Sequence, residues 1–365
     1  MSKWKKVKLG DVCSLYQPKT IPTKELKDDM PYYVYGANGI IGKYHSYNHI
    51  DSEIAIACRG ATCGTVNITL PKSWITGNAM VAHIESNELS FKYLFYVLSN
   101  ANMKNVITGA AQPQITRSNL KDLEIPLPAM EKQKKIAARL DAVSDLLAKQ
   151  KQLLSEQDTL IQSTFYDMFG DHQLSQQKGQ WNKISDVAVV AGGSTPKTQT
   201  PEYWDGDLNW FTPAELENCS WYVYSSQRKI TKAGVKSCHL EEFPINTVLL
   251  SSRAPIGKLA IARETFYCNQ GFKNIICGET VNPIYLYHLL MYNINYMKSL
   301  GKGATFKEIS KKIVEDIKIP VPPLELQEKF AAIVKQIETD KSKIKSAIAE
   351  TQTLFNALMA EYFED

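Results

Sequence analysis

The stretch GAAQPQITRSNLKDLEIPLPAMEKQ, residues 109–133, decides the fold because the chain contains it twice. Residues 303–327, GATFKEISKKIVEDIKIPVPPLELQ, align with it without a gap at an offset of 194. The pairs that match include Gly109 with Gly303, Ile115 with Ile309, Pro126 with Pro320, and Gln133 with Gln327. Self-similarity at a fixed offset predicts two copies of one structural unit.

Upstream of this stretch the two copies diverge but keep the same order of features. Arg59 in ACRGATCG corresponds to Arg253 in SSRAPIGK, and Trp4 corresponds to Trp181. The first copy is shorter by 17 residues. Two copies with unequal interiors indicate one scaffold that carries two different binding surfaces.

Each copy has the same expected order of elements. Short strands are predicted by β-rich runs between Gly, Pro and Asn, namely EIAIAC (53–58), TVNIT (65–69), TVLLSS (247–252) and KLAIA (258–262). A short helix is expected next, at about 90–99 and 284–292, each with an upstream Asn suited to capping. A Gly-rich turn and a run with alternating prolines then precede a long helix.

The long helices are predicted by two uninterrupted segments with apolar side chains in 4-3 spacing. From Glu131 to about Met168 there is neither Gly nor Pro. The expected seam positions are Ile136, Leu140, Val143, Leu147, Gln150, Leu154, Gln157 and Ile161 in the first helix, and Phe330, Val334, Ile337, Lys341, Ile344, Ile348, Thr351 and Phe355 in the second, with a continuation to Leu358 and Tyr362.

The length of these helices favours pairing over separate packing. A helix of this size is about 57 Å long, more than the diameter of a small domain, so much of each apolar stripe needs a partner. We therefore expect the two helices to form an antiparallel coiled coil. The alternative is two helices that each pack on their own domain. Centre-to-centre pairing brings Gln157 near Lys341, where two polar seam residues would help to set the register.

The predicted fold class is α+β, with two tandem β-rich domains that contain short helices and are each followed by a long α-helix. The expected boundaries are 1–130 for the first domain, 131–170 for its helix, 171–323 for the second domain with a linker at 171–180, and 324–365 for the second helix.

Composition favours a folded protein that contacts nucleic acid. Of 365 residues, 44% are hydrophobic and 22% are charged, which is enough for more than one core. No apolar run could span a membrane, and MSKWKKVKLG lacks the apolar core of a secretory signal, so we expect a cytoplasmic location. The net charge is only +4, but the excess of Lys and Arg falls in the two β-rich segments, where phosphate contact would favour it.

Several patterns that look catalytic have simpler explanations. Asn282-Pro283-Ile284-Tyr285 resembles the Asn-Pro-Pro-Tyr motif of adenine methyltransferases, but Asn followed by Pro is also an ordinary helix start. Gly257-Lys258 and Gly301-Lys302 lack the frame of a phosphate loop. His45 and His49 are four apart in an expected loop or strand rather than a helix, and no cysteine pair has zinc-ligand spacing. We predict no catalytic residue and no metal.

The ordered features together resemble the specificity subunits of type I restriction-modification systems, over essentially the whole chain. The first copy contributes YYVYGANGIIGKYHSYN, IACRGATCGTV, TGNAMVAHI, GAAQPQIT and LEIPLPAMEKQKKIAARL, and the second contributes GGSTPKTQTPEYWDGDLNWFTPAEL, LLSSRAPIGKLAI, CNQGFKN and IKIPVPPLELQEKFAAIV. The chain is compact for that family.

The resemblance implies a non-catalytic DNA-binding subunit with two target-recognition domains. Each domain would read one half of a two-part, asymmetric site in double-stranded DNA. The helix pair would hold the domains apart, by on the order of one to two DNA turns, and would dock two methyltransferase subunits. S-adenosylmethionine would be bound by those subunits, and ATP and Mg²⁺ by separate restriction and translocation subunits, with no cofactor on this chain.

Base edges and phosphates are contacted by polar and basic side chains on loops. The residues predicted to contact DNA are Lys43, Tyr44, His45, Tyr47, Arg59, Gln112 and Gln114 in the first domain, and Trp210, Arg253, Lys258, Asn269, Lys273, Lys302 and Lys307 in the second. Core packing is the alternative role for the aromatic residues, and a structural salt bridge is the alternative for the two equivalent arginines.

Two other functions fit parts of the sequence. One is a DNA adenine methyltransferase built around Asn282 and Tyr285, and the other is a coiled-coil scaffold that binds no nucleic acid. Methyl transfer by the chain alone would favour the first. Absence of DNA binding even with a methyltransferase partner would favour the second.

Overall fold

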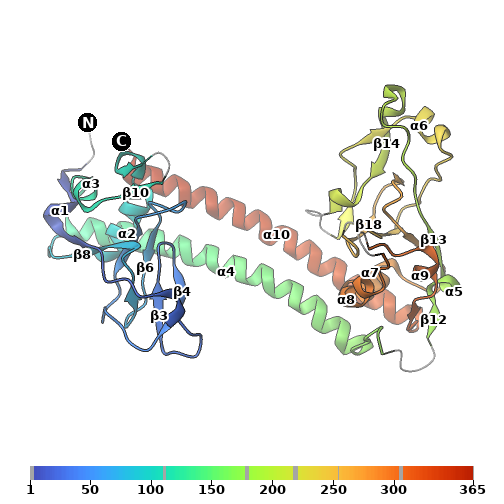
Figure 1. Cartoon of the computed structure of the whole chain (residues 1–365), viewed down its shortest axis with the longest axis horizontal. Helices are drawn as coiled ribbons and strands as arrows, with labels where there is room; N and C mark the ends of the chain where they lie inside the picture. Colours follow the sequence, from blue (N-terminus) through green and yellow to red (C-terminus); the bar gives the residue numbers. More distant parts are fainter. Residues whose placement is uncertain are drawn as a thin grey trace. The chain divides into compact units, whose positions relative to one another are not determined.

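The computed structural model describes residues 4–109, 112–176, 181–216, 221–253, 255–303 and 307–364. Its contacts divide the chain into two compact units: Met1–Leu153 with Ile344–Asp365, and Leu154–Lys343. Each unit contains one sequence repeat and parts of both long helices, α4 (Met130–Phe169) and α10 (Leu324–Phe363) (Figure 1). The unit boundary therefore lies within the two helices. Here the β-rich parts of the units are called domain 1 and domain 2.

Domain 1 is built around an antiparallel four-stranded sheet. In spatial order its strands are β2 (Cys13–Tyr16), β8 (Ala79–Ile84), β5 (Ile54–Ala57) and β6 (Val66–Ile68). All four residues of β5 are buried, as expected for a central strand. Helix α2 (Phe91–Asn100) joins the same hydrophobic cluster, in which Tyr93 and Leu94 are fully buried.

A second, smaller sheet extends domain 1. In it, β3 (Tyr32–Tyr35) is antiparallel to β4 (Ile40–Tyr44) and parallel to β7 (Trp74–Ile75). The remaining short elements are η1 (Thr23–Glu25), η2 (Met103–Asn105), the β9 (Ile107–Thr108) and β10 (Gln114–Ile115) hairpin, α1 (Leu9–Val12), α3 (Arg117–Lys121), and the pair β1 (Lys6–Lys8) and β11 (Glu124–Pro126).

Domain 2 repeats this plan with longer connections. Its main sheet has the order β13 (Ala188–Ala191), β20 (Asn274–Cys277), β17 (Val248–Leu250), β18 (Leu259–Ala262) and β15 (Tyr222–Val223). Its smaller sheet consists of β16 (Lys229–Ile230), β14 (Trp204–Phe211) and β19 (Tyr267–Cys268). The other elements are η3 (Pro201–Tyr203), η4 (Pro213–Leu216), α5 (Ile184–Val187), α6 (Lys232–Ser237), α7 (Pro283–Tyr292), α8 (Ile294–Ser299), α9 (Lys311–Glu315), and the pair β12 (Asn182–Lys183) and β21 (Lys318–Ile319).

The two domains share topology as well as element order. Strand β14 is antiparallel to β16 and parallel to β19, as β3 is to β4 and β7. The ion pair between Lys8 and Asp122 (2.9 Å) recurs as Lys183 with Asp316 (2.7 Å). The predicted fold class, α+β with two tandem domains each followed by a long helix, is therefore confirmed.

A buried glutamine fixes the start of each long helix to its own domain. The Gln133 side chain is fully buried, accepts a hydrogen bond from the Ser90 N–H (2.8 Å), and donates to the carbonyls of Glu88 (2.7 Å) and Pro128 (2.8 Å). This amide uses its oxygen and both of its hydrogens, which is the condition for burying it without a desolvation penalty.

The second repeat reproduces the same arrangement around Gln327. Its side chain accepts from the Asn282 N–H (2.8 Å) and donates to Thr280 (3.0 Å) and Pro322 (2.7 Å) carbonyls. Only the helix start differs. Asn282 caps α7 through its side chain, whereas Ser90 makes no side-chain cap at α2, so the expected Asn cap is correct in the second repeat and wrong in the first.

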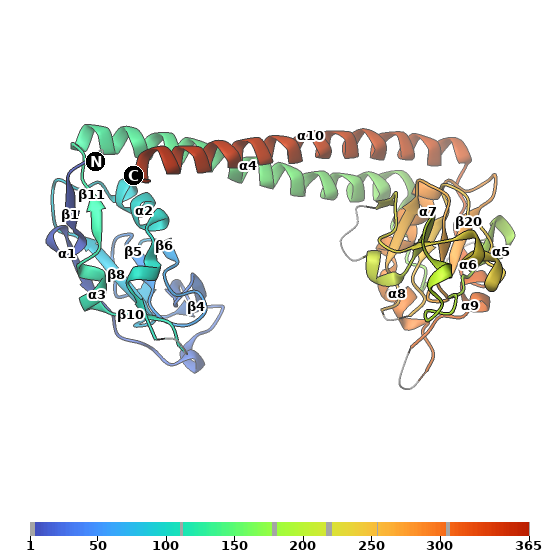
Figure 2. The same ribbon diagram turned by 90° about the horizontal axis from the view of Figure 1, so that it is seen from above.

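In each unit the beginning of one long helix lies beside the end of the other (Figure 2). In the first unit, Ile136 and Leu140 of α4 share a core cluster with Met359 of α10, and the Arg139 guanidinium donates to the Tyr362 hydroxyl (3.0 Å). In the second unit, the Phe165 ring of α4 packs edge-on against Phe330 of α10 at 5.4 Å. The contacts within each unit thus make the helix pair antiparallel.

Every expected seam position is buried or half-buried. The alternative of packing on the helix's own domain is also partly correct, because Ile136 and Phe330 belong to the cores of their respective domains. The two helices bring Lys341 near Gln157, as expected, but its ion pair is with the next residue along α4. The Lys341 ammonium reaches Asp158 (2.7 Å) and Glu338 (2.6 Å). Burial lowers the pKa of Lys341, but these two carboxylates more than offset that effect and raise it.

None of the helices in the described part of the chain combines the length and the apolarity needed to cross a membrane.

The hydrogen bonds of the buried glutamines yield a stability prediction. Replacing Gln327 with Leu leaves one buried N–H and two carbonyls without partners, so we expect the free energy of unfolding to fall by about 2–4 kcal/mol. The matched control is Gln336→Leu on the same helix, at an exposed position, where we expect a change within about 0.5 kcal/mol. Urea unfolding followed by circular dichroism measures both free energies of unfolding. Equal effects for the two variants would contradict a stabilising role for the hydrogen bonds of Gln327.

Candidate nucleic-acid interface

In each domain a short hairpin closes against the end of a central strand. In domain 1, Arg59 faces Gln114 of β10 in an antiparallel bridge, and the Ile115 N–H donates to the Cys58 carbonyl (3.0 Å). In domain 2, Arg253 faces Glu308, and the Ile309 N–H donates to the Ser252 carbonyl (3.0 Å). The repeated arginines predicted from the sequence therefore occupy equivalent backbone positions, each opposite the second arm of a hairpin.

The side chains on this shared backbone differ in chemistry. Gln114 pairs with Thr108 across the hairpin in domain 1, whereas Glu308 faces Lys302 in domain 2. Glu308 also lies 3.3 Å from the Lys273 ammonium. One hairpin is thus lined by neutral hydrogen-bonding groups, and the other by alternating charges.

The turn of each hairpin needs glycine. Gly109 has φ +86° and Gly303 has φ +123°, values that L-residues adopt at a cost. A Cβ at Gly109 would also collide with the Gln112 carbonyl oxygen. Residues 110–111 and 304–306, between the hairpin arms, lie outside the described residues.

The other residues predicted in domain 1 gather on the smaller sheet. The Lys43 ammonium lies over the Tyr33 ring (5.2 Å), and Tyr44 packs against His45 with ring centroids 4.1 Å apart. The Tyr44 hydroxyl donates to Glu25 (3.2 Å), and burial together with this bond raises its pKa. Tyr47 packs edge-on against Tyr32. The structure thus divides these predictions into two groups, one on the smaller sheet and one on the hairpin with Arg59, Gln112 and Gln114.

One residue predicted in domain 2 must be corrected. Trp210 is only 2% exposed, and its indole N–H donates to the Ser194 carbonyl (3.1 Å), so it is a core residue and is not available to DNA. Core packing, the alternative role for this side chain, is the correct one. Its packing partners are Trp204, Ile230 and Tyr267.

Three further residues of domain 2 are engaged inside the domain. The Lys258 ammonium donates to the Pro213 carbonyl (2.9 Å), and the Asn269 side chain accepts from the Gly271 N–H (2.9 Å). The Lys273 side chain is 14% exposed. By contrast, Lys302 and Lys307 are exposed beside the hairpin, and Arg253 is half-buried. The surface open to a ligand near this hairpin is therefore basic.

A residue missed by the sequence analysis lies on the smaller sheet of domain 2. The Arg228 guanidinium stacks over the Trp204 ring, with its central carbon 3.5 Å from the ring centroid. No sequence signal pairs these residues, because the arginine precedes β16 and the tryptophan begins β14.

The patterns that looked catalytic have structural roles. The Asn282 side chain accepts from the Ile284 N–H (2.9 Å), and Tyr285 is fully buried with its hydroxyl on the Pro320 carbonyl (3.0 Å). His49 is bonded to Tyr16 (3.0 Å) and Asn48 (2.6 Å). Among the described residues, no three His, Cys, Asp or Glu side chains are grouped to hold a metal ion.

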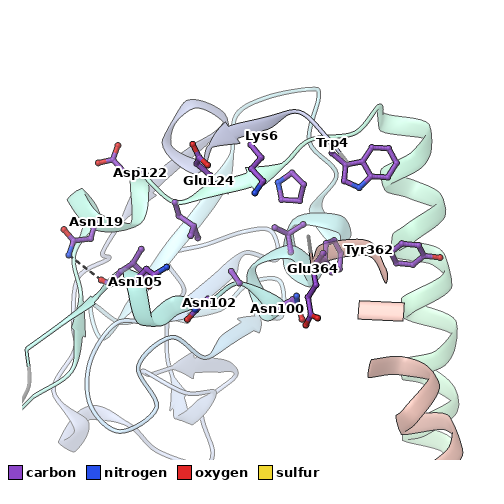
Figure 3. Close-up of a pocket in the computed structure, with 16 residues that line it drawn as sticks. Trp4, Lys6, Asn100, Asn102, Asn105, Asn119, Asp122, Glu124, Tyr362 and Glu364 are labelled. Atoms are coloured by element: carbon purple, nitrogen blue, oxygen red, sulfur yellow. Dashed lines mark hydrogen bonds between the residues drawn. The ribbon is translucent and has the colours of Figure 1, made fainter. Parts of the chain in front are cut away.

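The first unit contains a cavity of about 770 Å³ (Figure 3), and none of the residues that line it belongs to β9 or β10. Four asparagines and the end of α10 line it, together with Trp4 and Lys6. The strand pairing aligns Trp181 of the second repeat with Lys6, so the expected match of Trp181 with Trp4 is wrong. In the second repeat, the His172 ring packs against Trp181, and Leu174 is fully buried with its N–H bonded to Asn293. The segment after α4 thus packs beside Trp181 and Asn293 in the second repeat.

Comparisons with known proteins agree in family and fold. The family model described as "Type I restriction modification DNA specificity domain" matches residues 1–156 and 178–351. The chain is similar to the MjaIX specificity subunit of Methanocaldococcus jannaschii (43% identity over 43% of this chain and 37% of that one) and to the putative MjaX specificity subunit of the same organism (28% identity over 72% and 64%). It thus spans less than two thirds of either relative.

A solved structure shows the same fold. The type I restriction-modification S subunit from M. genitalium matches 100% of this chain and 96% of its own, with a TM-score of 0.65 and 17% identity.

The requirement for glycine at position 109 can be tested by measuring the stability of a variant. Gly109→Ala forces a side chain into a left-handed conformation and against the Gln112 carbonyl, so we expect a loss of about 2–3 kcal/mol, of which about 1–2 kcal/mol is backbone strain. Gly60→Ala is the matched control, because Gly60 has φ +81° but no heavy atom within 4 Å of its Cβ position. Thermal unfolding should show the larger loss at Gly109. Indistinguishable melting temperatures for the two variants would show that a Cβ at position 109 does not collide with the Gln112 carbonyl.

Proposed function

The chain belongs to the family of type I restriction-modification DNA specificity proteins, and on that premise we propose that it reads an asymmetric, two-part DNA sequence with its two domains. Each domain reads one part. The helix pair docks methyltransferase subunits, which bind S-adenosylmethionine, and through them the restriction and translocation subunits, which use ATP and Mg²⁺. The chain itself carries out no chemical step.

The observation that carries this proposal is the pair of equivalent hairpins with different side chains. The backbone bridge at Arg59 and Gln114 recurs at Arg253 and Glu308, so the scaffold is held constant while the reading groups change. A protein that reads two unlike sequences with one fold needs this combination. A catalytic site would instead need one particular set of side chains.

The chemistry of the two hairpins suits different bases. An amide such as that of Gln114 can bond both the N6 and N7 positions of adenine, whereas a carboxylate such as that of Glu308 can accept only from an amino group such as the N4 of cytosine. The exposed Lys302 and Lys307 supply the phosphate contacts that give affinity without sequence preference.

The outer face of the helix pair offers apolar surface for docking. In the first unit, Leu146 and Leu153 of α4 are spaced by seven residues and are 47% and 44% exposed. Leu354 of α10, also in the first unit, is 50% exposed. The seven-residue spacing puts Leu146 and Leu153 on one face of α4, and a contiguous apolar patch is the kind of surface that a partner covers.

The surroundings of Asn282 and Tyr285 do not support the methyltransferase alternative. The functional atoms of Asn282 and Tyr285 are used inside the fold, as a helix cap and as a buried hydrogen bond to Pro320. Both groups would have to be removed from the core before they could hold a base.

The proposal is tested in a complex of this chain with its methyltransferase subunits. We expect site-specific methylation of a two-part sequence by the complex, and no methyl transfer by the chain alone with S-adenosylmethionine. Methylation by the isolated chain would show that it is itself the enzyme. Failure of the assembled complex to bind any DNA would favour a scaffold role.

Two substitutions separate reading from general affinity. Gln114→Ala should relax one base position in one half-site by about 1–3 kcal/mol of discrimination and leave the other half-site unchanged. Lys307→Ala should weaken binding to all sequences alike and reduce the salt slope by about one. Competition binding with single-base variants of the site, over a range of salt concentrations, measures both. If Gln114→Ala altered both half-sites equally, division of reading between the domains would be wrong.

A further inference from the structure

The smaller sheet of domain 2 holds two tryptophans in fixed orientations. Trp204 and Trp210 are 7% and 2% exposed, and their rings meet edge-on at 5.0 Å. The Trp204 indole N–H donates to the Lys197 carbonyl (3.2 Å), as that of Trp210 does to Ser194. Because both ring nitrogens are bonded to one loop, neither ring can turn without breaking a hydrogen bond.

Arg228 lies on this fixed surface. Its guanidinium carbon is 3.5 Å from the Trp204 centroid and 5.8 Å from that of Trp210, yet the residue is exposed. The backbone beneath it is also held, since the Ser226 hydroxyl donates to the Arg228 carbonyl (2.6 Å) and accepts from the Trp210 N–H (2.9 Å). Attraction between the guanidinium and the indole face favours one position of this flexible side chain.

The stacked guanidinium has no acidic partner in the part of the chain that the structure describes, where no carboxylate lies within ion-pair distance of it. Stacking uses the face of the guanidinium and leaves its N–H groups free in the plane. A planar pair of N–H donors matches the O6 and N7 acceptors of guanine in the major groove, and a single point charge does not.

Domain 1 places a different cation at the corresponding sheet. There Lys43 of β4 lies over the Tyr33 ring of β3, at 5.2 Å. The two sheets have the same topology, but lysine offers a compact charge in place of a planar pair of donors. The strand pairing places Lys229, not Arg228, at the position equivalent to Lys43. The Arg228–Trp204 pair therefore stands elsewhere on its sheet than the Lys43–Tyr33 pair.

We propose that Arg228, oriented by Trp204, is a specificity-determining residue that reads a guanine in the half-site of domain 2. This inference rests on the proposed function, because it requires that domain 2 binds DNA. It adds a second reading element to that domain, on the smaller sheet rather than on the hairpin.

A purely structural role would give a different result. If Arg228 only covered the Trp204 ring, an unbranched apolar side chain would replace it without effect on sequence preference. Arg228→Met keeps the cover and removes the donors, and Arg228→Lys keeps the charge and removes the planar arrangement. Comparison of these variants separates cover, charge and donor geometry.

The experiment measures competition binding by the complex with its methyltransferase subunits, against DNA that carries every single-base change in the cognate site. We expect Arg228→Lys and Arg228→Met each to reduce the preference for guanine at one position of one half-site by tenfold or more. All other positions should keep their preferences. Lys232→Ala, which removes an exposed positive charge from the neighbouring helix α6, is the matched control and should leave the preference at that position unchanged.

Each other outcome overturns the assignment. Equal weakening against all sequences would make Arg228 a phosphate contact, and unchanged preference in both variants would make it a structural residue. Thermal unfolding of Arg228→Met checks that the domain remains folded; if it does not, Arg228→Lys decides alone. The wild-type complex must first prefer its site over other DNA. If it does not, the proposed function fails, whereas loss of the Arg228 effect alone leaves that function intact.

Discussion

The structure depends on how the first turn of each long helix is attached to its domain. Gln133 and Gln327 are buried, and each bonds the start of the short helix as well as the proline-rich strand before the long one. Because a buried amide is stable only when all of its groups are bonded, the connection tolerates little displacement. The direction in which each helix leaves its domain is thereby fixed, and the apolar stripes can meet their partners.

With the helix starts fixed, the remaining backbone can stay constant while side chains change. The bridges at Arg59 and Arg253 use main-chain groups, so the replacement of Gln114 by Glu308 at the equivalent position leaves the hairpin in place. The smaller sheets likewise share their topology but carry different cation–ring pairs, a lysine over tyrosine in one domain and an arginine over tryptophan in the other. Duplication of a fold held by backbone contacts is a direct route to two reading surfaces.

Much of the fold could be predicted because its signals are local or repeated. The long helices were expected from 4-3 spacing without Gly or Pro, and the equivalence of Arg59 with Arg253 from alignment of the chain with itself. The predictions failed where a residue's environment is made by distant segments. Trp210 was expected to contact DNA, but a loop and two strands bury it. The sequence places Lys341 near Gln157 but does not identify its ion-pair partner, which is the adjacent Asp158.

By itself, the sequence determined the duplication, the α+β class and the seam of the helix pair, because periodicity and self-similarity depend only on the order of residues. Only the tertiary structure decided which polar side chains are free to meet a ligand. The sequence suggests that Lys258 and Asn269 are free to contact DNA, but both side chains make hydrogen bonds inside the domain. No sequence pattern points to Arg228, yet its exposed side chain lies over a tryptophan ring. Availability depends on burial and on partners far along the chain, and these exist only once the chain has folded.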